Sequence, residues 1–171
     1  GGKCANLADI ADLGLPVPPG FTIPTVACAK YYEFGRVKLF DVIRKEVEDA
    51  LAKLETTTGK RFGQGPNPLL VSVRSGAAAS MPGMMDTVLN LGLNDATAQA
   101  LIALTGNERF VKDSRRRFIQ MYGNVVLGVE HHDFEHELDA VKKAKGVKLD
   151  TELAAADLDA VIARYLKVVE K

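Results

Sequence analysis

The sequence has no tryptophan, only two cysteines and no excess of charge of either sign. Lysine plus arginine and aspartate plus glutamate both number 22, so no global field favours nucleic acid or an anionic membrane. No apolar run approaches the ~20 residues that a membrane-spanning helix needs. Cys4 and Cys28 lack metal-ligand spacing, which is typical of reduced thiols in an intracellular protein. We therefore expect no nucleic-acid partner, no membrane partner and a cytoplasmic location, with organelle targeting left open.

Several catalytic signatures are also missing. The sequence has no Ser or Cys nucleophile constellation, no paired-carboxylate motif, no internal repeat and nothing that resembles a signal peptide. A start at Gly1 without methionine indicates trimming. The 171 residues are 47% apolar and 26% charged, a balance typical of one globular domain or two small subdomains.

The stretch Leu69–Gly92 carries the clearest functional pattern. Its apolar, partly alternating start predicts a strand that leads directly into Arg74, and Gly76, Pro82 and Gly83 then interrupt regular structure. A planar, always charged guanidinium at the end of a strand suits the oxygens of a phosphate. An ordinary β-hairpin with a surface arginine is the alternative interpretation.

A second candidate anion site lies at the start of the chain. Gly1-Gly2-Lys3 precedes a short helical pattern that places Leu7 and Ile10 on one face and ends at Gly14. Free backbone N–H groups, flexible glycines and a lysine together suit an anion. The alternative is a solvated lysine before an ordinary helix.

The rest of the first half predicts helices joined by extended segments. We expect, in order, an extended turn, a short strand, two helices and a loop, at Leu15–Gly20, Phe21–Ile23, Thr25 to about Phe34, Leu39–Leu54 and Thr57–Pro68.

The second half predicts helices only. We expect them at 95–104, 107–122, 133–145 and 157–170, with glycine or aspartate at their starts and stops. The fold class is therefore α+β, with an α/β part at 1–92 and a helical subdomain at 93–171. The apolar stripe of the last helix runs to the end of the chain, so we expect this subdomain to lack a packing partner.

Two polar clusters in the second half could bind ligands. His131, His132 and His136 could suggest a metal site, but the spacing is not HExxH and a solvated helix start is favoured. The basic run Arg115–Arg117 predicts a solvent-facing surface, with docking of another domain as the alternative.

Aromatic and sulfur-containing side chains suggest further contacts. Tyr31 and Tyr32 are more typical of packing residues than of base-stacking platforms. Met81, Met84 and Met85 either line an adenine pocket or adapt to irregular packing around a loop.

Three segments together resemble the N-terminal, ATP-grasp nucleotide-binding domain of the pyruvate, phosphate dikinase family. They occur in the order of the family and cover nearly the whole chain, as GGKCANLADIADLGLPVPPGFTI, VSVRSGAAASMPGMMDTVLNLGLND and DSRRRFIQMYGNVVLG. The resemblance implies the N-terminal portion of an ATP-grasp domain followed by the helical subdomain. It also implies a phosphotransferase that makes phosphoenolpyruvate, AMP and diphosphate from ATP, phosphate and pyruvate through a phosphohistidine on another domain.

The resemblance also implies roles for single residues. Lys3 and Arg74 would hold the ATP polyphosphate, backbone N–H groups near Gly83 would cover it, and Met85 would contact the nucleotide. Mg²⁺ would bridge the phosphate oxygens, with its carboxylates in a later subdomain. Cys4 departs from the family, which has glycine at that position.

The chain so interpreted is half of a nucleotide site and is inactive alone. Its partners would be ATP, the missing ATP-grasp half and the phosphohistidine domain of the same polypeptide, in a homo-oligomeric full-length enzyme. Two other classes stay open at this stage: a nucleotide-binding regulatory module without catalysis, and a helical interaction domain that acts through residues 94–171.

Overall fold

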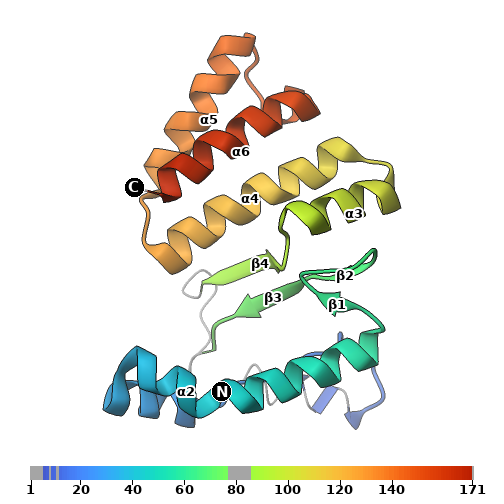
Figure 1. The fold of residues 1–171 in the computed structure, drawn as a ribbon, viewed down its shortest axis with the longest axis vertical. Helices are drawn as coiled ribbons and strands as arrows, with labels where there is room; N and C mark the ends of the chain where they lie inside the picture. Colours follow the sequence, from blue (N-terminus) through green and yellow to red (C-terminus); the bar gives the residue numbers. More distant parts are fainter. Residues whose placement is uncertain (1–5, 8, 11, 77–85, 171) are drawn as a thin grey trace. The chain divides into compact units, whose positions relative to one another are not determined.

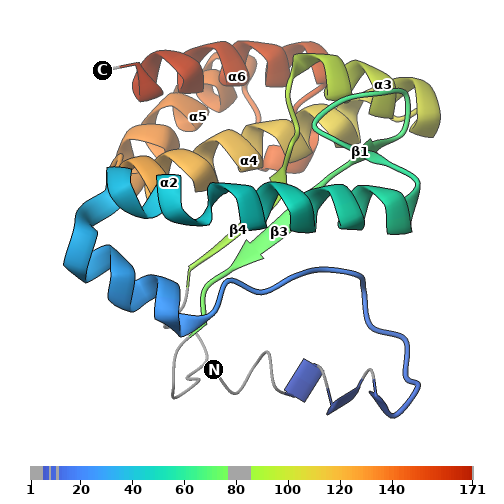
Figure 2. The ribbon, with the colours of Figure 1, turned by 60° about the horizontal axis from the view of Figure 1, so that its bottom comes forward.

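A computed structural model describes residues 6, 7, 9, 10, 12–76 and 86–170 (Figures 1 and 2). The chain divides into two compact units, residues 1–60 with 75–85 and residues 61–74 with 86–171, which are described separately. Helices and small sheets occur together, which confirms the α+β class. The boundary predicted near Leu93 separates a part with strands from a part with helices only. It differs from the division into two compact units and stays a prediction. No helix within the described ranges is long and apolar enough to cross a membrane.

The first unit begins with helical turns at the described residues between 6 and 12, and Gly14 follows with φ 74. This glycine adopts the left-handed conformation that commonly ends a helix, as predicted. The predicted strand Phe21–Ile23 is wrong, because this segment has no regular structure. Pro24 lies directly after it and has no backbone N–H to donate to a ladder.

The long helix α2 spans Thr25–Thr58, where the sequence predicted two helices. Gly35 interrupts it with φ 76 and ψ 174, so the two predicted helices meet at a kink. α2 continues beyond the predicted end at Leu54, and the hydroxyls of Thr56, Thr57 and Thr58 in its last turn donate to carbonyls of the preceding turn. Gly59 then ends it with φ 65.

The strands of the second unit form two two-stranded sheets. β1 (Arg61–Phe62) pairs in parallel with β2 (Pro68–Leu69), and β3 (Val71–Arg74) pairs antiparallel with β4 (Thr87–Leu91). The predicted strand from Leu69 is confirmed as a nearly continuous segment that contributes to both sheets. The predicted loop before it is partly wrong, since it contains β1.

Four α-helices and one 3₁₀ turn complete the second unit. They are α3 (Asp95–Thr105), α4 (Glu108–Leu127), α5 (His131–Lys145), η1 (Asp150–Glu152) and α6 (Ala155–Val169). The described residues after α3 begins include no strand, which confirms the helical prediction. Most ends of these helices agree with the ranges predicted from the sequence. The side chains of Asn94 and Asn107 accept hydrogen bonds from the first turns of α3 and α4, and left-handed glycines end α3, α4 and α5.

The main core joins α4, α5 and α6, and α4 lies between β4 on one side and α6 on the other (Figure 1). Phe134 and Tyr165 are fully buried and meet edge to face, with ring centroids 5.0 Å apart. A smaller cluster around Leu93, Ala98 and Val111 joins α3 and α4. Most of the apolar stripe of α6 is buried, at Leu158, Val161, Ile162 and Tyr165, and α6 packs on α4 and α5. Leu166 of the stripe is 41% exposed, and the expectation that the subdomain lacks a further packing partner stays a prediction.

The predicted end of this helix at residue 122, directly before Gly123, is also wrong. It lies inside α4, which continues to Leu127 and ends before Gly128. A Cβ atom at Gly123 would lie 2.5 Å from Cζ of Phe134, closer than real Cβ contacts. The glycine therefore permits close packing of α5 on α4.

Candidate functional site

The candidate site is the end of β3, where Arg74 is paired with Thr87 of β4. Arg74 is exposed, and Thr87 is half-buried. Within the described ranges, no residue forms an ion pair with Arg74, whereas the arginines of α4 are engaged in ion pairs or hydrogen bonds. The strand thus presents a guanidinium whose donors are available to a ligand with oxygen atoms.

A β-bulge sets the register of this strand pair. Val71 pairs with Leu91 and Val73 pairs with Val88, so two steps along β3 match three steps along β4, and the extra residue lies opposite Ser72. Paired residues share one face of a sheet, and successive residues alternate between faces. The bulge therefore brings the four apolar side chains onto one face and leaves the arginine–threonine pair on the other.

The bulge is held in place from two sides. Asn90 has φ 58, and among the described residues it is the only non-glycine with positive φ. Asparagine tolerates this left-handed conformation better than most residues. The N–H of Leu89 donates to Sδ of Met121 on α4 at 3.1 Å, and the carbonyl of Asn90 accepts from the N–H of Leu93 at 3.0 Å. Neither Asn90 nor Met121 was predictable from the sequence, because a bulge leaves no periodic signal.

The far end of the strand pair is anchored by a close approach of two turns. Gly92 has φ 104, and a Cβ there would lie 3.1 Å from the carbonyl oxygen of Leu69. The hydroxyl of fully buried Thr97 donates to the carbonyl of Gly92 at 2.9 Å. The side-chain amide of Asn94 donates through Nδ2 to the backbone carbonyl of Gly63 at 2.8 Å. These contacts tie the end of β4 to the start of α3 and to the turn before β2.

Among the residues predicted to bind the nucleotide, the structure describes only Arg74. Lys3, Gly83 and Met85 lie outside the described residues, as do Cys4, Met81 and Met84. Their predicted nucleotide contacts stay predictions, and so does the phosphate contact of Arg74.

The basic run on α4 is not a solvent-facing patch as a whole, and that prediction is wrong. Arg116 is only 3% exposed and donates to a carboxylate oxygen of Asp113 through Nε at 3.0 Å and through Nη2 at 2.9 Å. Arg115 pairs with Asp95 of α3, and only Arg117 projects largely into solvent. The three consecutive arginines lie in different environments because each residue of a helix is rotated around the axis relative to the one before it.

A polar network around Arg116 and Asp150 joins the helices. Asp150 accepts from Arg116 of α4 at 3.5 Å and from Lys142 of α5 at 3.2 Å, while Arg109 donates to its backbone carbonyl at 2.8 Å. Burial is the largest single influence on Arg116 and opposes its charge, but the hydrogen bonds and charge attraction of Asp113 and Tyr165 together outweigh it, so the pKa of Arg116 is raised above the ordinary value. These groups satisfy one another and serve packing rather than ligand binding.

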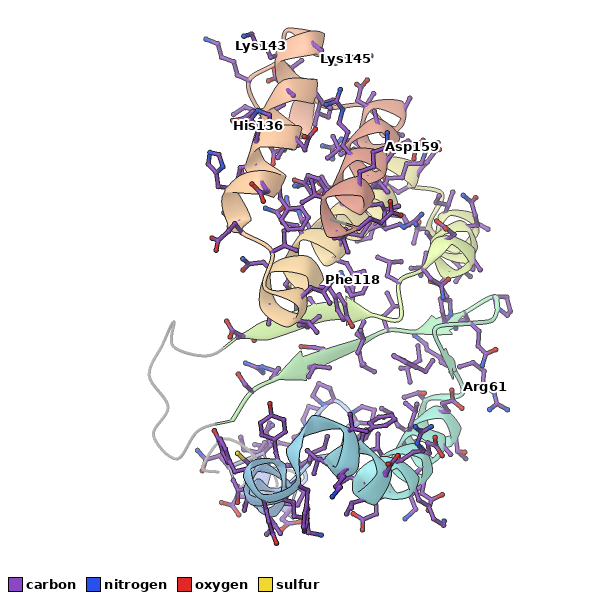
Figure 3. All side chains as sticks on the ribbon, turned by 60° about the vertical axis from the view of Figure 1, so that its left-hand side comes forward. Arg61, Phe118, His136, Lys143, Lys145 and Asp159 are labelled. Atoms are coloured by element: carbon purple, nitrogen blue, oxygen red, sulfur yellow. The ribbon has the colours of Figure 1, made fainter. Side chains whose placement is uncertain are left out.

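The histidines lie at the surface, at the start of α5. His131 begins the helix, and the side chains of His131 and His136 are 66% and 71% exposed, with His136 projecting outward in Figure 3. This arrangement matches the predicted solvated helix start. Within the described part of the chain, no three His, Cys, Asp or Glu side chains gather as a metal site would require.

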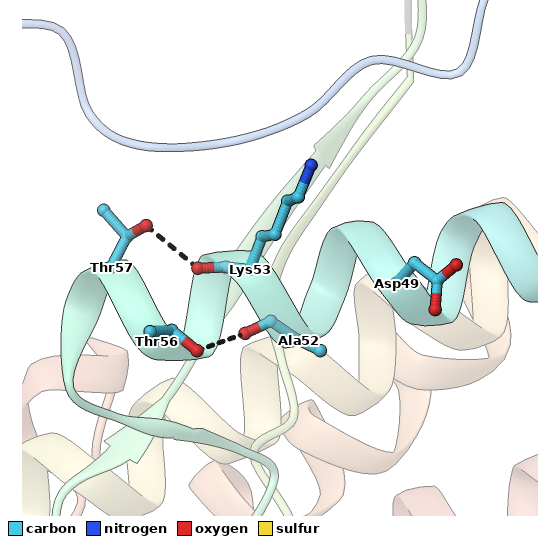
Figure 4. A pocket seen from close by; sticks show the side chains of 5 residues that line it. All are labelled: Asp49, Ala52, Lys53, Thr56 and Thr57. Atoms are coloured by element: carbon cyan, nitrogen blue, oxygen red, sulfur yellow. Dashed lines mark hydrogen bonds between the residues drawn. The ribbon is translucent and has the colours of Figure 1, made fainter.

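Arg74 lines neither of two surface hollows in the described part of the chain. One of about 620 Å³ is lined only by residues of α2, between Asp49 and Thr57 (Figure 4). Its threonines Thr56 and Thr57 donate to carbonyls of the same helix at 2.9 Å, so their hydroxyls are already used. Another, between α5 and α6, is lined by Glu137 and Arg164, which pair at 2.8 Å. Neither hollow brings together groups that predict a binding site.

Comparison with known proteins connects the strand pair to a nucleotide-binding family. The family model of the pyruvate phosphate dikinase AMP/ATP-binding domain matches residues 36–110, which include β3, β4 and Arg74. Pyruvate, phosphate dikinase of Rhizobium meliloti is 54% identical over 171 residues, which are 100% of this chain and 19% of that protein. The chloroplastic enzyme of Mesembryanthemum crystallinum is 55% identical over 168 residues, or 98% of this chain and 18% of that protein. The enzyme of Clostridium symbiosum is 50% identical over 171 residues, or 100% of this chain and 20% of that protein. The chain thus spans about a fifth of the length of these relatives.

Proposed function

Because this chain belongs to the pyruvate, phosphate dikinase family, as part of its AMP/ATP-binding domain, we propose that it forms the phosphate-holding wall of an ATP site. The complete enzyme converts ATP, phosphate and pyruvate into AMP, diphosphate and phosphoenolpyruvate through a phosphohistidine on another domain. The architecture is the N-terminal portion of an ATP-grasp domain, and the helices after Leu93 form its helical subdomain.

One observation supports this proposal most strongly. Arg74 lies exposed at a strand end inside the matched family region, without an ion pair to any described residue. Phosphoryl transfer depends mainly on positioning and on neutralising charge, and a fixed guanidinium provides both. Lys3, backbone N–H groups near Gly83 and Met85 complete the proposed contacts to the nucleotide.

In the complete enzyme Mg²⁺ would neutralise part of the phosphate charge of ATP. The described residues offer no cluster of three carboxylate or imidazole groups that would fit this ion, so we assign it no ligand here. The remaining ATP-grasp half and the phosphohistidine domain are the proposed partners, in a homo-oligomeric enzyme. A cytoplasmic location stays a prediction, and the chloroplastic relative leaves an organelle open.

Replacement of Arg74 in the full-length enzyme tests the assignment. Arg74→Ala removes charge-assisted hydrogen bonds worth about 1.5–3 kcal/mol each, so the dissociation constant for ATP rises roughly 10–150-fold in calorimetry. Arg74→Lys restores the charge but not the planar fork and recovers only part of the affinity. Arg117→Ala, which removes an exposed arginine from α4, is the matched control and leaves ATP affinity unchanged. Unchanged affinity and turnover in Arg74→Ala would refute the proposal.

Binding by the isolated chain separates this proposal from a non-catalytic nucleotide-binding module. One wall of a cleft buries less of a ligand than the roughly 70–90% usual for small-molecule sites. Residues 1–171 alone therefore bind ATP–Mg²⁺ weakly. A micromolar dissociation constant in calorimetry would instead favour a self-contained module.

A further inference from the structure

The β-bulge between β3 and β4 aligns apolar side chains on one face, and it also changes the residue that pairs with Arg74. The chain holds it with a non-glycine residue at φ 58 and with a thioether that accepts a hydrogen bond from a backbone N–H. β-Bulges and left-handed non-glycine residues both occur preferentially near functional sites. Asn90 and Met121 both lie in the described part of the second unit, together with Arg74.

The bulge determines which residue lies opposite Arg74. A regular ladder continued from the pair Val71–Leu91 would set Arg74 opposite Val88, because each step forward on β3 is one step back on β4. The extra residue shifts the pairing by one, so that Thr87 lies opposite Arg74 instead. The shift also keeps Val88 on the apolar face, where it is only 6% exposed.

We propose that the bulge at Leu89–Asn90, held by the left-handed backbone of Asn90 and by Met121 of α4, positions Arg74 for phosphate binding. Asn90 and Met121 are therefore positioning residues that touch no ligand. This inference rests on the proposed phosphate contact of Arg74. It means that α4, whose other face packs on α6, sets the geometry of the strand end through Met121.

A double-mutant cycle in the full-length enzyme tests the coupling. Asn90→Val places a β-branched side chain where φ must be positive, which removes the bulge. ATP affinity, measured by calorimetry, then falls on the order of tenfold, and Asn90→Gly, which permits the same φ, retains it. In an Arg74→Ala background, Asn90→Val has no further effect on ATP affinity, because the two residues act through one contact.

Additional variants keep the test decisive if Asn90→Val fails to fold. Asn90→Ala raises the cost of the left-handed conformation more mildly and lowers ATP affinity in the same direction. Met121→Leu conserves volume but removes the acceptor, so amide exchange at Leu89 becomes faster and ATP affinity falls a few-fold.

The outcomes separate the two proposals. If Arg74→Ala leaves ATP affinity unchanged, the proposed phosphate contact is wrong and the positioning role with it. If Arg74→Ala weakens ATP binding but the folded Asn90 and Met121 variants bind normally, only the positioning role is wrong. If Asn90→Val lowers ATP affinity by the same factor with Arg74 present and with Arg74→Ala, the two residues act independently and the positioning role is also wrong.

Discussion

The helical group formed by α4, α5, η1 and α6 and the strand pair β3–β4 each contain an arginine, and these arginines lie in opposite environments. Arg116 in the helical group is buried, and its donors are used by Asp113, Asp150 and Gln120. Arg74 in the strand pair is exposed and has no ion pair to a described residue. The first arginine contributes to folding because removing it would take both of its hydrogen bonds from Oδ1 of half-buried Asp113. The second remains available, which is what a ligand requires.

Removing the buried arginine is expected to have the largest effect on stability. Arg116→Ala leaves Asp113, whose side chain is 16% exposed, without its main partner and lowers the free energy of unfolding by about 3–5 kcal/mol. Urea denaturation measures this change, and Lys143→Ala, at an exposed residue of α5, serves as control. A loss below about 1 kcal/mol would show that the network contributes little to folding.

Packing in the same helical group gives the next largest effect. Gly123→Ala forces a methyl group toward Cζ of Phe134, which is fully buried, and costs about 1–3 kcal/mol even after the helix-propensity gain of alanine. Thermal unfolding measures the change. In a Phe134→Leu background the ring is absent, and the same substitution becomes nearly neutral. Additive losses from the two substitutions would contradict this explanation.

The strand pair is expected to show the reverse behaviour. Arg74→Ala changes the free energy of unfolding by no more than about 0.5 kcal/mol, because the side chain is exposed and breaks no described ion pair. Denaturation of this variant beside Arg116→Ala sharpens the comparison directly. A loss of more than about 1 kcal/mol would assign Arg74 a structural role.

The smallest effect is expected at an exposed carboxylate of the helical group. Backbone N–H groups of Leu149 and then Lys148 donate to Glu152 and lower its pKa from the usual 4.5. Its stabilisation is therefore present above pH 4.5 and disappears as pH falls through the lower pKa of the folded state. Glu152→Gln should reduce the acid sensitivity of the melting temperature. An unchanged dependence of the melting temperature on pH would show that Glu152 does not contribute to the acid sensitivity of the fold.

Local chemistry made several features of the fold predictable. The bounds of α3 to α6 agree with the sequence to within a few residues at most ends, because capping side chains and left-handed glycines act over one helical turn. The position of Arg74 at a strand end was predictable for the same reason, since an apolar alternating run ends at that residue.

The sequence by itself determined most ends of the helices of the second unit, except the end of α4, and which arginine closes a strand. Tertiary structure decided which arginine of α4 is buried, why Gly123 is required, what covers the stripe of α6 and where the bulge lies. Helical and strand periods report which residues share a face, but not which element packs there. Gly123 has its role only because Phe134 of α5 meets it, and Asn90 is held by Met121 through Leu89 only because α4 packs on β4.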